Sequence, residues 1–134
     1  MQSSSILNIR RETMAIKNIL VVDDSATERH ITGGILTKGG YNVTFAEDGE
    51  SGVAKAKSEQ PDLIVMDVVM PGLNGFQATR AISTDEATKH IPVIICTTKG
   101  QETDKIWGLR QGAKDYVTKP VDPAELLSKI AALN

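Results

Sequence analysis

Polar side chains with the chemistry of a phosphoryl-transfer site follow several short apolar runs in this 134-residue chain. They are Asp23, Asp24, Asp67, Thr97 and Lys119. A carboxylate can attack phosphorus to form an aspartyl phosphate, and a lysine or a hydroxyl can contact phosphate oxygens. Three carboxylates that lie close together repel one another, and oxygen ligands favour a hard cation such as Mg²⁺. The set therefore indicates phosphoryl chemistry assisted by Mg²⁺.

Five apolar runs predict the strands that carry these residues. The strands are expected over 19–22, 41–46, 63–66, 93–96 and 116–118. The first, third and fourth runs do not alternate and are rich in Val and Ile, which is typical of strands buried on both faces of a parallel sheet. The second and fifth runs are weaker, as edge strands often are.

Helices are expected between the strands, over 25–38, 48–58, 74–83, 102–111 and from Asp122 onward. Ser25 and Asp122 are suitable N-caps, and Pro123 suits a first helical position. Strands that alternate with helices imply right-handed crossovers and helices on both faces of one sheet. The expected fold class is thus α/β, with a single doubly wound five-stranded parallel sheet. Such sheets place their functional crevice beyond the carboxyl ends of the strands, where the polar set lies.

Composition excludes several classes of protein. The net charge of −2 gives no basic footprint, so we expect no nucleic-acid partner. A single cysteine, Cys96, rules out an internal disulfide and fits a reducing compartment. No stretch approaches the roughly 18–20 apolar residues that span a bilayer, so we expect no membrane insertion. The expected location is the cytoplasm.

Four motifs in order resemble the response-regulator receiver domains of bacterial two-component signalling, the CheY-like family. They are Asp23–Asp24–Ser25, the segment MDVVMPG over 66–72, Thr97–Thr98 and Lys119–Pro120. The resemblance covers residues 17–134. Residues 1–16 are left as an N-terminal extension, either a misassigned start or a short helix. The family implies a flavodoxin-like sheet with strand order 2-1-3-4-5.

The resemblance also implies a role for each motif residue. Asp67 would be the phosphoacceptor. Asp24 would be a direct ligand of Mg²⁺, with Asp67, the backbone oxygen of Val69 and, indirectly or weakly, Asp23. Thr97 and Lys119 would contact the phosphoryl group.

Three further features follow from the same resemblance. The Lys119–Pro120 peptide bond would be cis. Tyr116 would be an aromatic switch that turns inward when Thr97 moves. The resemblance further implies that the positions two residues after Asp67 and Thr97 help to set how a hydrolytic water reaches the phosphoryl group. Here they are Val69 and Lys99, which are neither amides nor carboxylates. We therefore expect slower self-dephosphorylation than in chemotaxis regulators that have an acid or an amide there.

Within the family, the segments 71–80 and 101–121 most resemble the small PilH-type regulators of type IV pilus twitching motility. The implied phosphodonor is a CheA-like histidine kinase. The chain ends after the last helix, so no output domain is expected, and a monomer or weak dimer would dock a downstream protein. The docking face would be formed by the helix over 102–111, the strand over 116–118 and the final helix. Whether the protein transmits a signal or drains phosphate from the kinase stays open.

Three other functions remain as alternatives. A degenerate receiver would bind partners without phosphorylation, although the complete set of site residues argues against it. A hydrolase of the haloacid dehalogenase type would carry its nucleophile after the first strand, whereas the isolated Asp67 follows the third. A flavodoxin-like cofactor binder would need a phosphate-accepting loop where Asp23 and Asp24 would repel phosphate. The expected protein is no turnover enzyme and catalyses only its own phosphorylation and dephosphorylation.

Overall fold

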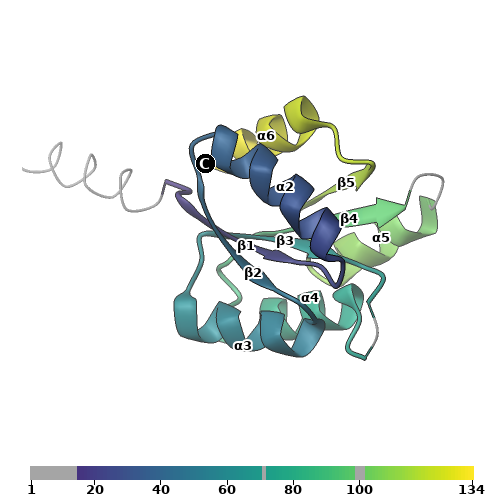
Figure 1. Cartoon of the computed structure of the whole chain (residues 1–134). Coiled ribbons are helices and arrows are strands. Elements are labelled where there is room, and N and C mark those ends of the chain that lie inside the picture. Colours follow the sequence, from purple (N-terminus) through teal and green to yellow (C-terminus); the bar gives the residue numbers. More distant parts are fainter. Residues whose placement is uncertain (1–14, 71, 99–101) are drawn as a thin grey trace, which may run out of the picture.

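The computed structural model describes residues 15–70, 72–98 and 102–134 (Figure 1). The expected N-terminal extension over 1–16 therefore lies almost entirely outside the described residues, as does Lys99. Among the helices of the described part, none is long and apolar enough to cross a membrane.

Five parallel strands form one sheet in the order β2-β1-β3-β4-β5. The strands are β1 (Asn18–Val22), β2 (Asn42–Ala46), β3 (Leu63–Asp67), β4 (Val93–Thr98) and β5 (Asp115–Lys119). Every neighbouring pair runs parallel. The weaker apolar runs, β2 and β5, are the edge strands. The doubly wound α/β fold and its strand order are thus confirmed, with element ends that differ from expectation by one or two residues.

Five helices connect the strands and cover both faces of the sheet. They are α2 (Ala26–Lys38), α3 (Gly49–Glu59), α4 (Gly75–Thr84), α5 (Glu102–Arg110) and α6 (Pro123–Ala132). In Figure 1, α2 and α6 lie on one face of the sheet, and α3, α4 and α5 lie on the other. This arrangement divides the apolar core into two clusters, one on each face.

The first strand shows why a continuous apolar run predicts a central strand. Successive side chains of a strand point to opposite faces. Leu20 and Val22 belong to the cluster beneath α3, α4 and α5, whereas Ile19 and Val21 belong to the other cluster. All four side chains are almost completely buried. The central strands are therefore held by packing on both faces, so the positions of their carboxyl ends are well determined.

Four of the helices have a side-chain N-cap close to the carboxyl ends of the strands. Ser25, Asp48, Asn74 and Asp122 each accept a hydrogen bond from a backbone N–H in the first turn of the following helix. Such caps satisfy N–H groups that have no partner within the helix. They fix where each helix starts and hence where the loops at the strand ends must lie.

Candidate functional site

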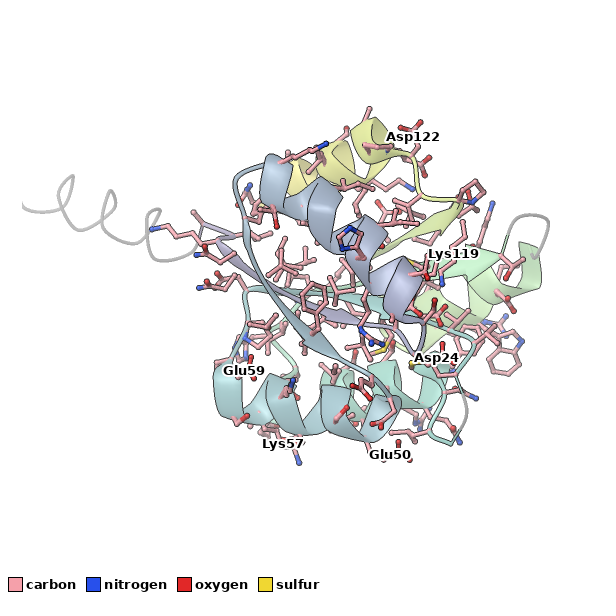
Figure 2. All side chains as sticks on the ribbon, in the orientation of Figure 1. Asp24, Glu50, Lys57, Glu59, Lys119 and Asp122 are labelled. Carbon is pink, nitrogen blue, oxygen red and sulfur yellow. The ribbon has the colours of Figure 1, made fainter. Side chains whose placement is uncertain are left out.

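The polar side chains singled out from the sequence meet at the carboxyl edge of the sheet. Asp23 and Asp24 follow β1, Asp67 ends β3, Thr97 lies in β4 and Lys119 ends β5. Figure 2 shows Asp24 and Lys119 at this edge, well away from Glu59 at the opposite end of α3. Parallel strands bring their carboxyl ends to one edge, so residues far apart in the sequence become neighbours.

Three carboxylates form the centre of the site. One oxygen from each of Asp23, Asp24 and Asp67 lies within 4.8 Å of the others. Asp23 and Asp67 are buried, with 4% and 5% of their surfaces exposed, while Asp24 is exposed. A cluster with only oxygen ligands and one solvent-facing member suits Mg²⁺, which keeps several waters when bound to proteins. The residues present therefore fit this ion.

A lysine lies between the two buried carboxylates. The Lys119 ammonium is 2.9 Å from Asp23 Oδ2 and 3.1 Å from Asp67 Oδ1. The Lys119–Pro120 peptide bond that follows is cis. The ammonium offsets part of the negative charge of the cluster, and its three donors can also contact a phosphate.

The charge states of the site follow from burial and from this pairing. Burial raises the pKa of Asp67, and the charge of Asp23 raises it further. Lys119 and a hydrogen bond from the Val69 N–H oppose this shift without cancelling it. Burial alone would lower the pKa of Lys119, but its hydrogen bond with Asp23 and the nearby carboxylate charges hold that pKa above its usual range. The lysine is therefore a fixed cation beside the Asp67 carboxyl.

Hydrogen bonds fix the loop that carries Asp23. Its N–H donates to the Ala46 carbonyl at the end of β2, over 3.1 Å. Its Oδ1 accepts from the Ser25 N–H at 3.0 Å. Its carbonyl accepts from Arg29 Nη1 at 2.7 Å. The contact from Arg29 was not anticipated from the sequence; an arginine in the first turns of a helix, where a cation is disfavoured, was the only signal that could have indicated it.

The loop after Asp67 is held against α3 and α4. Gly75 donates its N–H to the Val68 carbonyl at 3.3 Å, and Leu73 donates its N–H to Glu50 Oε1 at 3.2 Å. The Val69 side chain is 66% exposed beside the site. The role of Glu50 was also missed, because nothing in its sequence context distinguishes it from any acidic residue near a helix start.

Thr97 and Tyr116 lie on the neighbouring strands β4 and β5. The Thr97 side chain is buried, and its hydroxyl donates to the Val117 carbonyl over 3.5 Å, a long and therefore weak hydrogen bond. The half-buried Tyr116 ring packs against the core cluster beneath α3, α4 and α5. The ammonium groups of Lys105 and Lys129 lie 4.8 and 4.4 Å from the centre of that ring. These lysines come from α5 and α6, so the tyrosine joins both helices to the edge strand.

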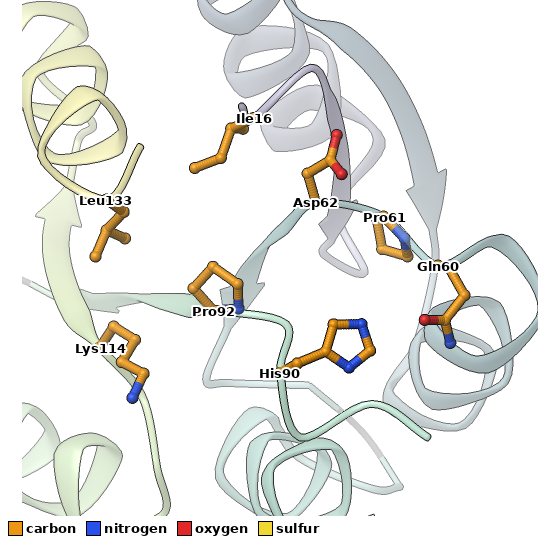
Figure 3. A pocket seen from close by; sticks show the side chains of 8 residues that line it. All are labelled: Ile16, Gln60, Pro61, Asp62, His90, Pro92, Lys114 and Leu133. Atoms are coloured by element: carbon orange, nitrogen blue, oxygen red, sulfur yellow. The ribbon is translucent and has the colours of Figure 1, made fainter. Parts of the chain in front are cut away.

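A sizeable cavity lies at the other end of the sheet. It has a volume of about 550 Å³ and is lined by Ile16, Gln60, Pro61, Asp62, His90, Pro92, Lys114 and Leu133 (Figure 3). Several of these residues directly precede strands, so the cavity faces the amino ends of the strands. The Asp62 carboxylate there accepts hydrogen bonds from the Lys17 and Asn18 N–H groups. None of the acidic cluster lines this cavity, and the chemistry of the carboxyl edge is separate from it.

Comparisons with known proteins agree with this geometry. Residues 19–131 match the model of the response regulator receiver domain family. The chain is 59% identical over 115 residues to the protein PilH of Pseudomonas aeruginosa, covering 86% of this chain and 95% of PilH.

Two solved structures resemble the fold closely. The chemotaxis protein CheY4 of Vibrio cholerae has a TM-score of 0.81 and 32% identity, covering 90% of this chain and 100% of that one. The receiver domain of a sensor histidine kinase from Pseudomonas aeruginosa has a TM-score of 0.81 and 33% identity, covering 89% and 98%. That second structure holds a magnesium ion coordinated in its active site cleft. By sequence and by fold, this chain belongs to the family of response regulator receiver domains.

Proposed function

We propose that this protein is a response regulator of a phosphorelay, which accepts a phosphoryl group on Asp67 from a histidine kinase. One observation carries the proposal: the Asp67 carboxylate lies in a cluster with Asp23 and Asp24 and 3.1 Å from the Lys119 ammonium. Within this proposal, residues 17–134 make up the receiver and residues 1–16 precede it.

The proposed metal site uses oxygen ligands only. Asp24 and Asp67 would bind Mg²⁺ through their carboxylates and Val69 through its carbonyl, while Asp23 would act through water or as a weaker ligand. When bound, Mg²⁺ would offset the negative charge of the three carboxylates and of the transferring phosphoryl group. The magnesium ion in the related kinase receiver supports this assignment.

The protein's own residues then divide the work of phosphoryl transfer. An Asp67 oxygen attacks the phosphorus of a phosphohistidine, the P–N bond breaks, and the departing imidazole takes up a proton from solvent. Lys119 stays protonated and neutralises phosphoryl oxygens as the bond to Asp67 forms. Thr97 exchanges its weak hydrogen bond with the Val117 carbonyl for one to a phosphoryl oxygen.

The signalling surface is proposed to be the face formed by α5, β5 and α6. Movement of Thr97 would free space beside Tyr116 on the neighbouring strand and let its ring turn inward. Ile106, Trp107 and Leu109 of α5 are about half exposed and could contact a downstream protein on this face. The similarity to PilH supports a place in type IV pilus or chemotaxis-like control, with a CheA-like kinase as donor, in the cytoplasm. The proposal is compatible with two roles for the protein: transmission of a signal through this face, and drainage of phosphate from the kinase.

Phosphorylation of the purified chain by acetyl phosphate tests the proposal. Intact mass should show one added phosphoryl group that requires Mg²⁺ and is absent in Asp67→Asn. Asp62→Asn is the matched control, since Asp62 lies at the amino end of β3, away from the cluster. Modification that persists in Asp67→Asn would refute Asp67 as the acceptor. An absence of both modification and Mg²⁺ binding in the wild type would favour a phosphorylation-independent interaction module.

A further inference from the structure

Asp23 is bonded through every polar group that it carries. Its N–H donates to Ala46, its two carboxylate oxygens accept from Ser25 and Lys119, and its carbonyl accepts from Arg29. Asp24, the next residue, is exposed and makes no hydrogen bond or ion pair with any other residue of the described part. With no partner for its side chain among these residues, Asp24 is positioned only through its backbone.

The peptide group between Asp23 and Asp24 is the element that links the two carboxylates. A peptide unit is planar, so fixing the Asp23 carbonyl also fixes the Asp24 N–H and the direction of its Cα. Arg29 Nη1 donates to that carbonyl at 2.7 Å. The guanidinium thus holds the peptide plane from which the Asp24 side chain projects.

Arg29 holds this peptide group without forming an ion pair with any of the carboxylates proposed to bind the metal. None of the ion pairs within the described residues involves Arg29, although three carboxylates lie nearby. It is the fourth residue of α2, near a helix N-terminus, where a positive charge is disfavoured. The hydrogen bond to the Asp23 carbonyl explains why an arginine occupies this unfavourable position, because it anchors the loop after β1.

We infer that Arg29 is a positioning residue of the metal site, which orients the Asp23–Asp24 peptide so that the exposed Asp24 carboxylate is presented to the cation. The inference rests on the proposed function, since it assumes that the acidic cluster binds Mg²⁺. It adds a residue outside the acidic cluster, on a helix, whose contribution is made through a backbone carbonyl.

A purely electrostatic role for Arg29 predicts a change in Mg²⁺ affinity of opposite sign to that predicted by a positioning role. A positive charge beside the cluster repels Mg²⁺, so removing it should tighten binding if Arg29 acted only as a charge. If Arg29 positions the peptide, its removal should weaken binding, because Asp24 would sample orientations away from the ion. The sign of the change therefore distinguishes the two roles.

Isothermal titration of Mg²⁺ into the full chain provides the first measurement. Arg29→Met should raise Kd roughly tenfold, the lower end of the range for residues that orient metal ligands. Arg29→Lys keeps the charge but loses the guanidinium's geometry, so its Kd should lie between those of the wild type and Arg29→Met. Lys38→Met is the matched control, since it removes one positive charge from the far end of the same helix and should change Kd by less than about twofold.

The Mg²⁺ dependence of phosphorylation by acetyl phosphate provides a second readout. The Mg²⁺ concentration for half-maximal rate should rise in Arg29→Met by the same factor as Kd, while the rate at saturating Mg²⁺ stays close to wild type. A general loss of structure would instead lower the saturating rate. Thermal unfolding without Mg²⁺ checks that each variant is folded. If Arg29→Met does not fold, the Kd and the phosphorylation rate of Arg29→Lys decide the test.

The outcomes separate this inference from the proposed function. Unchanged or tighter Mg²⁺ binding in both Arg29 variants, with normal binding in the wild type, would overturn the positioning role and leave the receiver function intact. A wild type that binds no Mg²⁺ would refute the metal site itself, and the positioning role with it. Weaker binding in both variants, with Lys38→Met unchanged, would establish the role.

Discussion

The ammonium of Lys119 lies 3.1 Å from Oδ1 of Asp67, the carboxylate proposed to accept the phosphoryl group. This one cation serves two acids, because it also lies 2.9 Å from Asp23 Oδ2. Its charge is divided between them, and burial together with the Asp23 charge keeps the pKa of Asp67 raised. The site thus holds more negative charge than the protein itself neutralises, as a site that recruits a cation should.

The raised pKa of Asp67 has a consequence for stability. A carboxyl whose pKa is higher in the folded state than in the unfolded state favours folding when protonated and opposes it when ionised. Asp67→Asn should therefore raise the free energy of unfolding at pH 7 without Mg²⁺, by roughly 1 kcal/mol, the size of a typical stabilising substitution. The gain should shrink as the pH falls and disappear well below about 4, where Asp67 is protonated in both states. Urea unfolding at the two pH values measures it.

Asp48 provides a control of opposite sign. Hydrogen bonds from the Ser51 N–H and hydroxyl lower the pKa of this helix-capping carboxyl. Its ionised form therefore favours folding above the unfolded-state pKa, and that contribution is lost as the pH falls. Asp48→Asn should give no gain at pH 7. A gain there equal to that of Asp67→Asn would show that the effect is general charge reduction and not removal of the buried Asp67 charge.

Cys96 should be inert in the folded protein. Burial raises the pKa of its thiol to about 12, and the Lys119 charge opposes this only in part. At pH 8 the folded protein should hold roughly a thousandfold less thiolate than the unfolded chain, whose cysteine pKa is near 8.5. Alkylation by iodoacetamide, followed by mass, should be slower by about that factor without urea than in urea. Rapid alkylation of the native protein would contradict the burial of this thiol.

Strands can be predicted from sequence where burial determines the residue pattern. The runs of β1, β3 and β4 are apolar at every position because helices cover both faces of the sheet, and this pattern can be read directly. Edge strands carry a weaker signal, since β2 leaves Asn42, Thr44 and Phe45 exposed. The strand order came from the resemblance to the receiver family, because apolar periodicity alone does not specify which strands pair.

The candidate site was predicted as a set of residues but not as a network. Asp23, Asp67 and Lys119 could be assigned to one edge because parallel strands end together. The hydrogen bond from Arg29 to the Asp23 carbonyl could not, because a long side chain has many rotamers and its end point depends on tertiary packing. The hydrogen bond that Glu50 accepts from the Leu73 N–H could not be predicted either, because nothing in the sequence distinguishes Glu50 from other acidic residues near helix starts.

Gly75 should be essential to the geometry at the end of β3, the strand that carries Asp67. A Cβ at this position would lie 2.0 Å from the Asp67 carbonyl oxygen and 2.6 Å from Val68 Cα, and backbone atoms cannot move aside as a side chain can. Gly75→Ala should therefore lower the free energy of unfolding by about 2 kcal/mol, in the range for overpacking. It should also slow phosphorylation by acetyl phosphate. Urea unfolding and intact mass measure the two effects.

Gly34→Ala is the matched control for this substitution. Gly34 lies in α2, and a Cβ there meets no atom within 4 Å. Alanine in a helix interior is favoured over glycine, so this variant should gain roughly 0.5–1 kcal/mol. Equal destabilisation by both substitutions would mean that the close approach at Gly75 does not exist.

The phosphoryl group on Asp67 should be long-lived because of the residue two positions later. Val69 is 66% exposed beside the site and has no polar group to orient a hydrolytic water. Val69→Asn supplies an amide there and should shorten the lifetime roughly tenfold, which corresponds to about 1.4 kcal/mol in the barrier. The decay of the phosphorylated mass after removal of acetyl phosphate measures this lifetime.

Val69→Ala keeps the position apolar and should leave the lifetime within about twofold, so it separates water orientation from simple access to the site. A wild-type lifetime of only seconds, or equal acceleration by both variants, would show that the polarity of this position does not control hydrolysis.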